Sequence, residues 1–341
     1  MKKNIKTLLI LFLISLVLYT PNVFAQAEIK DRTHIEVDGK PVNKYYDNEV
    51  SGNKNLTDTA GKITLIIDGK EYVGFCVDFG MILKKGEAES ISVEEYFANG
   101  IGDAKAKELV KKITEYIRFG YGSTGRTTNK YYLATQQLIW EAINSTGFYT
   151  SDYYIEQWND PNAFKTKFTN FRWSNDGGAT ALDISKEIND IKKSIIEYYK
   201  TPSFCSSQER LEIEVGETIE YTDNNNVLSE FNVICDDGIE CKVENNKLKV
   251  TAINEAGSND IKFSKTDKNE MNNYIYRHSN GQGVLLDSGT LEPVSCEFGI
   301  DSFKNEKTAD IKIIYIITIG LFCGVMAYIT YYTKKSLDVL K

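Results

Sequence analysis

The sequence predicts an α+β fold in which a β-sandwich or barrel-like sheet region carries an inserted helical subdomain. Short apolar runs with alternating residues and tight turns occupy residues 27–80 and return over 205–290, which is typical of strands. Between them, over 90–200, apolar residues recur at helical spacing. One C-terminal transmembrane helix is predicted to follow, because a long uncharged apolar run lies near the end of the chain.

The N-terminal residues 1–25 have the pattern of a signal peptide. Lys2, Lys3 and Lys6 precede the apolar stretch 8–19, and Val23-Phe24-Ala25 resembles a cleavage site. Pro21 interrupts the apolar stretch, which disfavours an uncleaved anchor. We therefore expect an exported protein whose mature chain begins at Gln26.

The second apolar run predicts a transmembrane helix over 312–333. Lys334 and Lys335 follow it directly, which predicts a cytoplasmic tail of residues 334–341. A polar stretch over 291–311 precedes the run and predicts a short stalk. The expected location is the cell membrane, with a single span and the large N-terminal part outside the cell.

The early strands contain a hairpin signal and an unpaired cysteine. Ile63–Ile67 and Glu71–Phe79 flank Asp68-Gly69, a dipeptide typical of tight hairpin turns. In the second strand Val73, Phe75, Val77 and Phe79 alternate onto one face, so Cys76 falls on the other. This placement favours a functional role for Cys76 over a purely structural one.

Three helices are expected within 90–200. Asp103 is predicted to cap the first, which ends at Gly120, and the third carries the apolar stripe 184–198. The middle helix, over 128–143, places Gln136 inside an apolar stripe that includes Trp140. A buried amide must be hydrogen-bonded, so Gln136 is expected to bind polar groups inside the protein.

Five of the six cysteines lie in the region predicted to be exported, and an odd number there calls for an explanation. Cys235 and Cys241 flank what looks like the end of a hairpin, and Cys205 and Cys296 bracket the late strands. Four cysteines allow three pairings. We predict Cys235–Cys241 and Cys205–Cys296, which leaves Cys76 over.

Composition excludes several classes of function. The formal net charge is −8 without any basic block, so nucleic-acid binding has no support. The sequence has two histidines, His34 and His278, and no cluster with metal-ligand spacing. We expect neither a metal nor a cofactor.

Three blocks of this sequence, in this order, resemble the thioester domains of Gram-positive surface adhesins. The first is Phe75-Cys76 on a strand. The second is the helical segment Thr135-Gln136-Gln137-Leu138-Ile139-Trp140, preceded by Phe119-Gly120-Tyr121-Gly122. The third is Gln282 followed by an apolar strand. The segment 216–228 is also similar to the family's late β region, so the likeness covers most of 28–290.

The resemblance implies that residues 26–290 form a thioester domain. In that family the strand cysteine and the late glutamine join their side chains with loss of ammonia, which here means Cys76 and Gln282. Gln136, Trp140, Thr135, Phe75 and Tyr121 are expected to support the site. Gly283 departs from the family pattern, which more often has a larger side chain after the glutamine.

The resulting hypothesis is a covalent surface adhesin. It acylates an amine, for example of a lysine, on a host or neighbouring surface protein, and reacts once without turnover. One alternative is an exported cysteine peptidase or transpeptidase that uses Cys76 with His34 or His278. The other is a non-covalent binding module whose cysteine is incidental. The sequence names neither the target ligand nor the oligomeric state.

Overall fold

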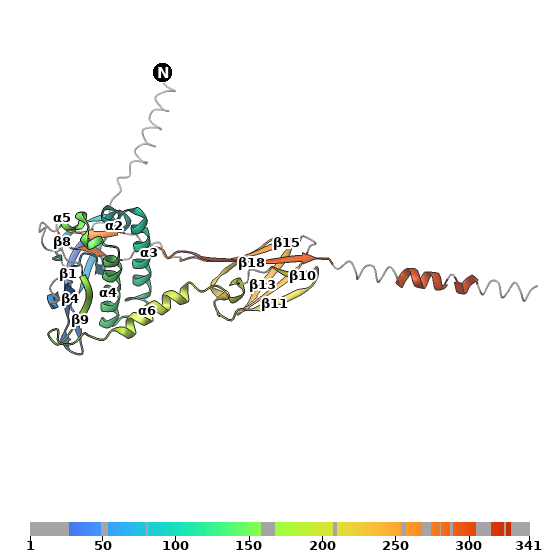
Figure 1. The fold of residues 1–341 in the computed structure, drawn as a ribbon, viewed down its shortest axis with the longest axis horizontal. Coiled ribbons are helices and arrows are strands. Elements are labelled where there is room, and N and C mark those ends of the chain that lie inside the picture. The colour runs from blue at the N-terminus through green and yellow to red at the C-terminus, as the bar shows by residue number, and fades with distance from the viewer. Residues whose placement is uncertain are drawn as a thin grey trace, which may run out of the picture. The chain divides into compact units, whose positions relative to one another are not determined.

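The computed structural model describes residues 27–48, 54–79, 81–157, 168–206, 210–253, 257–267, 274–279, 281–286, 289–304, 315–323 and 325–328. These residues fall into two compact units (Figure 1). The first unit contains the residues up to 199 together with 267–292. The second contains 200–266 and the residues from 293 onward. The predicted signal peptide and cytoplasmic tail lie outside the described residues.

A closed six-stranded barrel forms the centre of the first unit. Its strands follow the order β1 (Ala27–His34), β6 (Gly61–Ile67), β7 (Lys70–Cys76), β17 (Gly283–Leu285), β16 (Tyr274–Arg277) and β8 (Gly86–Ser92). Each neighbouring pair is antiparallel. The α+β class and the barrel-like sheet are therefore as predicted, and early and late strands share one sheet.

The predicted hairpin is β6–β7. Ile67 pairs with Lys70, and the two turn residues Asp68 and Gly69 have φ values of 49° and 77°, as a tight Asp-Gly turn requires. The predicted alternation is wrong at Val73, which is 37% exposed. Beyond it both faces of the strand are covered, so Cys76 is buried although it does not share the face of Phe75.

Two smaller sheets extend the first unit. One pairs β2 (Glu36–Val37) with β3 (Lys40–Pro41), and the other has the order β5 (Lys54–Thr59), β4 (Asn43–Asn48) and β9 (Phe168–Ser174). Strand β9 interrupts the region that was predicted to be helical. It pairs with β4 from Ser174 opposite Asn43 to Phe168 opposite Asn48, so pairing between distant segments determines this strand.

The helices pack around the barrel. They are α2 (Val93–Ile101), α3 (Asp103–Phe119), α4 (Asn129–Ser145), α5 (Asp152–Gln157) and α6 (Ser185–Tyr198), with the short η1 (Phe148–Thr150) after α4. The predicted helix limits agree closely with α3, α4 and α6. The predicted cap is wrong, because Gly102 occupies the N-cap of α3 with φ 80° and Asp103 lies in the first turn.

The second unit is built from two sheets. One has the order β10 (Leu211–Glu214), β18 (Val294–Phe303), β15 (Gly257–Lys265) and β12 (Asn232–Cys235). The other has the order β11 (Thr218–Thr222), β14 (Lys247–Ala252) and β13 (Ile239–Glu244). The rings of Tyr221 on β11 and Phe298 on β18 lie 5.0 Å apart, so side chains from both sheets share a core.

This unit corrects two predictions. Residues 26–290 do not form one domain, because residues 200–266, which include β10 to β15, form a core of their own. The chain leaves this unit after β15, supplies β16 and β17 to the barrel, and returns as β18. Within the predicted stalk over 291–311, Val294–Phe303 form strand β18, with largely alternating buried and exposed residues, and residues 305–311 lie outside the described residues.

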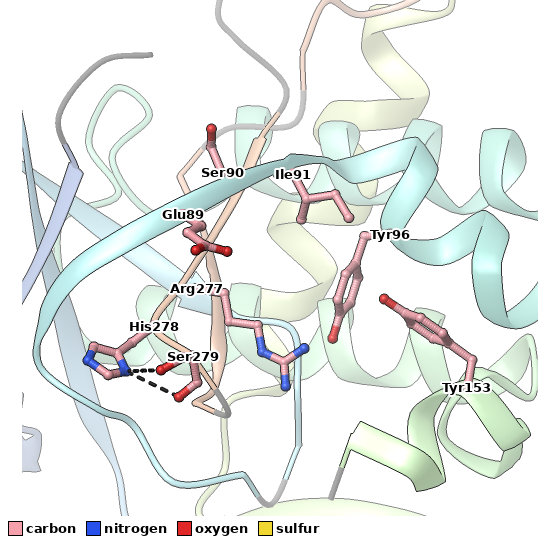
Figure 2. Close-up of a pocket in the computed structure, with 8 residues that line it drawn as sticks. All are labelled: Glu89, Ser90, Ile91, Tyr96, Tyr153, Arg277, His278 and Ser279. Atoms are coloured by element: carbon pink, nitrogen blue, oxygen red, sulfur yellow. Dashed lines mark hydrogen bonds between the residues drawn. The ribbon is translucent and has the colours of Figure 1, made fainter. Parts of the chain in front are cut away.

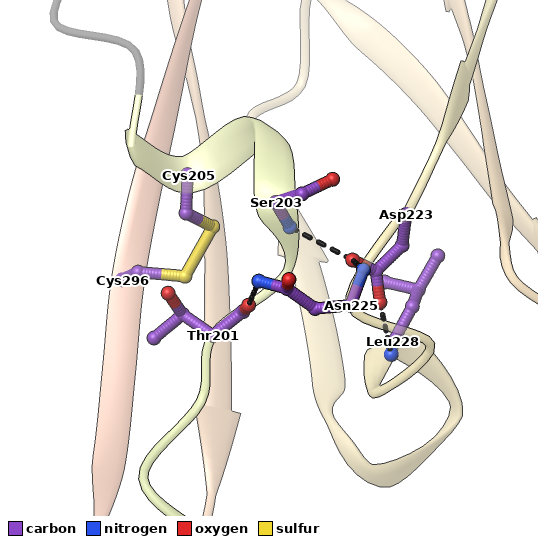
Figure 3. Close-up of a disulfide and its surroundings, with 7 residues drawn as sticks. All are labelled: Thr201, Ser203, Cys205, Asp223, Asn225, Leu228 and Cys296. Carbon is purple, nitrogen blue, oxygen red and sulfur yellow. Dashed lines mark hydrogen bonds between the residues drawn. A yellow bond between two sulfur atoms is a disulfide. The ribbon is translucent and has the colours of Figure 1, made fainter. Parts of the chain in front are cut away.

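Both predicted disulfides are present, with Cα–Cα distances of 6.0 Å for Cys205–Cys296 and 6.4 Å for Cys235–Cys241. Cys235 and Cys241 belong to β12 and β13, which lie in different sheets, so this bond joins two sheets and does not close a hairpin. Cys205 lies in η2 (Ser203–Ser206) and ties the start of the unit to β18 (Figure 3).

Asp223 organises the chain beside the Cys205–Cys296 disulfide (Figure 3). Its carboxylate accepts hydrogen bonds from the backbone N–H groups of Ser203, Asn225, Val227 and Leu228, at 2.7–3.0 Å. Burial alone would raise the pKa of Asp223, but these hydrogen bonds outweigh it and lower the pKa. The carboxylate thus holds η2 and η3 (Leu228–Glu230) together.

No helix among the described residues is both long enough and apolar enough to cross a membrane.

Candidate functional site

Strands β7 and β17 bring Cys76 and Gln282 together. Val284 pairs with Cys76, and the Val77 N–H donates to the Gly283 carbonyl at 3.1 Å, which continues the ladder. Gln282 directly precedes β17 and therefore lies beside the end of β7. Residues 206 positions apart in the sequence become neighbours in this way.

The two side chains are in direct contact and buried. The Gln282 amide Nε2 donates to the Cys76 Sγ, and both groups also donate to the Asp78 carbonyl at 3.4 Å. Cys76 is 3% exposed and Gln282 is 4% exposed. The Cys76 sulfur and the Gln282 carboxamide thus lie together in a small space that is largely shielded from solvent.

Gln136 on α4 holds the backbone of Cys76. Its Oε1 accepts from the Cys76 N–H and its Nε2 donates to the Cys76 carbonyl, both at 2.8 Å. Strand β6 runs alongside β7 only as far as Gly74, so this amide takes the place of a neighbouring strand at Cys76. The prediction that Gln136 is buried and hydrogen-bonded near Cys76 agrees with this geometry.

Hydroxyl groups of three tyrosines from the surrounding helices donate hydrogen bonds to backbone carbonyls on either side of Cys76. Tyr132 donates to the Gly74 carbonyl at 2.9 Å, Tyr149 to the Val77 carbonyl at 2.8 Å, and Tyr154 to the Phe79 carbonyl at 3.1 Å. Buried carbonyls without partners would destabilise the fold, so these contacts fix the segment around the cysteine. Sequence patterns do not identify these tyrosines as site residues, because only the tertiary structure shows which carbonyls lack strand partners.

Asp78 fixes the glutamine side of the site. Its carboxylate accepts from the Tyr96 hydroxyl at 2.6 Å and from the Gly283 N–H at 2.7 Å. Burial raises the pKa of Asp78 above its ordinary value. A Cβ on Gly283 would come within 2.9 Å of the Asp78 carboxylate, which explains why glycine follows Gln282 in this chain.

A cavity of about 30 Å³ lies beside the pair. Its lining includes Cys76, Gln136 and Gln282 together with Lys44 of β4 and Trp140 of α4; the remaining lining residues are Arg32, Thr59, Ala60, Gly61, Ile63, Tyr132 and Trp173. A space of this size holds about one water molecule. Bulk water therefore has little access to the sulfur and the carboxamide carbon.

The environment of Cys76 differs from that of a catalytic thiol. Burial raises the pKa of the Cys76 thiol to about 12, and the nearby Lys44 only partly opposes this effect. Nucleophilic cysteines in enzymes have a lowered pKa and a neighbouring base. Neither His34 nor His278 lines the cavity, so the described residues do not provide such a base from histidine.

The other predicted support residues lie around this site in a second layer. Phe75 stacks on Tyr132 with ring centres 5.1 Å apart. The Thr135 hydroxyl accepts from the Tyr121 N–H at 2.9 Å, and the Tyr121 ring packs edge-on against Tyr132. Thr135 and Tyr121 therefore position helix α4 and its preceding loop and do not line the cavity.

A larger pocket of about 260 Å³ lies between β8, β16 and the helices α2 and α5 (Figure 2). Arg277 points toward Tyr96 and Tyr153 across it, and His278 lies at its edge with Ser279 (Figure 2). Neither Cys76 nor Gln282 lines it. Within the described part of the chain, no group of three His, Cys, Asp or Glu residues is arranged to hold a metal ion.

The comparisons with known proteins give one structural likeness. No protein-family model matches the sequence, and no curated protein matches it. The fold is similar to the solved thioester domain of the Staphylococcus aureus TIE protein, with 21% sequence identity and a TM-score of 0.48. That match covers 82% of this chain and 100% of the other.

Proposed function

We propose that Cys76 and Gln282 form an internal thioester and that the protein is a surface adhesin that uses it for covalent attachment. The Cys76 sulfur attacks the Gln282 carboxamide carbon, a C–S bond forms and the C–N bond breaks. The thiol proton leaves with the amide nitrogen as ammonia. The observation that carries the proposal is the direct, buried contact between Gln282 Nε2 and Cys76 Sγ.

The surroundings suit both the formation and the survival of a thioester. Gln136, the tyrosine hydroxyls and Asp78 hold the two backbone segments in place. Such positioning raises the effective concentration of the two reacting groups by several orders of magnitude. The cavity admits little water, which slows hydrolysis. A thioester also accounts for a cysteine without a disulfide partner in a chain with an exported character.

The attachment step follows from the polarity of the bond. An amine attacks the acyl carbon, which belongs to Gln282, so a new amide forms there and the Cys76 thiol is released. The target is proposed to be a protein amine, for example a lysine, on a host or neighbouring surface. The reaction occurs once per molecule, so the protein is not an enzyme in this proposal.

The proposed site of action is the outer face of the cell membrane. This rests on the signal-peptide pattern of residues 1–25 and the uncharged run within 312–333. A peptidase or transpeptidase is less well supported, because the raised pKa of Cys76 opposes nucleophilic catalysis.

Methylamine treatment tests the attachment chemistry. The purified protein is incubated with methylamine, digested and analysed by mass spectrometry. We expect an N-methylamide at Gln282 and a free thiol at Cys76, with no adduct in the Cys76→Ala variant. A methylamine adduct at another residue, or none under conditions that open ordinary thioesters, would contradict the proposal.

A further inference from the structure

Two side chains of the Cys76 cavity have no role in the chemistry described so far. Lys44 is 8% exposed, and its Nζ lies 5.0 Å from the ring centre of Phe79 and 5.4 Å from that of Trp140. Lys44 and Trp140 line the same cavity as Cys76 and Gln282. Burying a cation this deeply costs desolvation energy, and contacts with aromatic rings such as these help to offset that cost.

The Trp140 indole provides a second observation. Its Nε1–H is buried and has no hydrogen-bond partner among the residues that the structure describes. Trp140 acts as a donor towards Cys76 and lowers the pKa of its thiol, so the indole N–H lies near the reacting sulfur. An unsatisfied buried donor destabilises a fold, so a stronger partner that forms only during the reaction would explain its presence.

The proposed reaction creates such a partner. When sulfur attacks the Gln282 carboxamide carbon, the carbonyl oxygen becomes an oxyanion; when an amine later attacks the thioester, the same oxygen becomes negative again. In a cavity with little water, this charge needs donors supplied by the protein. Of the charged side chains near Cys76, Asp78 has the wrong sign, while Lys44 and Arg32 have the right one.

We infer that Lys44 and Trp140 stabilise the negative charge on the Gln282 carbonyl oxygen, both when the thioester forms and when an amine opens it. The inference rests on the proposed function. In formation the oxyanion collapses, the carboxamide C–N bond breaks, and ammonia leaves with the thiol proton. In opening the collapse breaks the C–S bond, and the thiolate takes a proton from the attacking amine. Lys44 and Trp140 donate hydrogen bonds in both directions and are not consumed.

The test compares Lys44→Met, Lys44→Arg and Trp140→Phe with the parent protein. Each is produced in unfolded form, with a starting mass that shows the Gln282 carboxamide intact, and is then refolded while the loss of ammonia is followed by intact mass; methylamine opening is followed by release of the thiol. We expect Lys44→Met to slow both reactions on the order of 10²-fold, as removal of one oxyanion donor does. Lys44→Arg keeps the cation and should restore part of the rate, which a packing role would not explain.

Lys265→Met is the matched control. Lys265 is 7% exposed and lies 5.2 Å from the Phe231 ring centre, but it belongs to the second unit. Its loss should leave both rates unchanged. If Lys44→Met does not fold, Trp140→Phe decides the question, because it removes the indole N–H and leaves a smaller aromatic ring in its place; reactions slower on the order of 10²-fold are expected.

The outcomes separate this inference from the function on which it rests. If the parent never loses ammonia, the proposed function fails. If the parent loses ammonia and opens with methylamine, and the folded Lys44→Met and Trp140→Phe variants do so at the parent rate, the function stands and the inference is overturned.

Discussion

Cys76 combines full burial with contact to one reactive partner, and this combination determines how its thiol behaves. Desolvation raises the thiol pKa to about 12, above its ordinary value of 9.0. A thiol in this state is almost entirely protonated at neutral pH and reacts slowly with external reagents. Its reaction with Gln282 depends on proximity and not on intrinsic reactivity.

The Gln282→Ala variant makes this property measurable, since it leaves a free thiol. Native Gln282→Ala at pH 8 should react with iodoacetamide far more slowly than the same protein in denaturant. The folded state holds the proton more tightly than the unfolded state, so the stability contributed by this group is complete below about pH 9 and is lost as the pH rises towards 12. Urea unfolding across this range measures it, with Cys76→Ala as the control. Equally fast native labelling would contradict the burial.

Gln136 contributes through two hydrogen bonds to the Cys76 backbone. Gln136→Ala should lower the yield of the thioester and destabilise the first unit by about 1–3 kcal/mol for each backbone group left unsatisfied. Intact mass gives the yield and urea unfolding gives the stability. Gln137→Ala is a suitable control, because Gln137 lies on the same helix and donates to the exposed Glu141. A full thioester yield in Gln136→Ala would reduce Gln136 to a packing residue.

Sequence patterns predicted some site residues and not others, for a physical reason. An amide inside an apolar helical stripe must be bonded, so Gln136 was predictable from helical spacing alone. Lys44, Asp78 and the tyrosine hydroxyls act through contacts between distant segments, such as Tyr96 with Asp78 and Tyr149 with Val77. No local spacing encodes those contacts, and Trp140 was predictable only through the family resemblance.

At the scale of elements, the three-residue strand β17 has the largest effect on the site. It fills the gap between β7 and β16, closes the barrel and places Gln282 beside Cys76. Long, strongly periodic elements such as α3, α4 and the β6–β7 hairpin were predictable. Strands β9 and β16 were not, because they depend on partners far along the chain, and β17 was expected only through the family resemblance.

Gly283 gives β17 its close approach to β7. A Cβ at this position would meet Ile275 at 2.8 Å and Val77 and Asp78 at 2.9 Å. Gly283→Ala should therefore displace β17 or the Asp78 carboxylate and lower the thioester yield by intact mass, with a drop in the melting temperature. An alanine variant with the parent's yield and stability would show that the contact relaxes without consequence.

The whole molecule is assembled by a chain that crosses between its two units three times, after residues 199, 266 and 292. A domain boundary was not predictable here, because the strands of 211–265 and the strands of the barrel have the same local pattern. What the sequence did predict at this scale are the disulfide partners, since the spacing of Cys235 and Cys241 favours their pairing.

A thioester between β7 and β17 should stabilise the first unit, because it closes a loop between residues 206 positions apart. The chain-entropy treatment of cross-links gives about 5 kcal/mol for a loop of this size. Opening the thioester with methylamine should lower the melting temperature by roughly 10–20 °C, at about 2–4 °C per kcal/mol. Calorimetry before and after treatment measures this shift, and Cys76→Ala should show none. An unchanged melting temperature after opening would contradict the predicted cross-link.

The intact mass of the purified, untreated protein tests the central claim most directly. A thioester predicts a mass one ammonia below that of the sequence with both disulfides formed. Cys76→Ala and Gln282→Ala should each have the full mass expected for their own sequence. A parent protein that shows the full mass, with Cys76 alkylated after denaturation, would contradict the thioester and leave a non-covalent binding module as the better account.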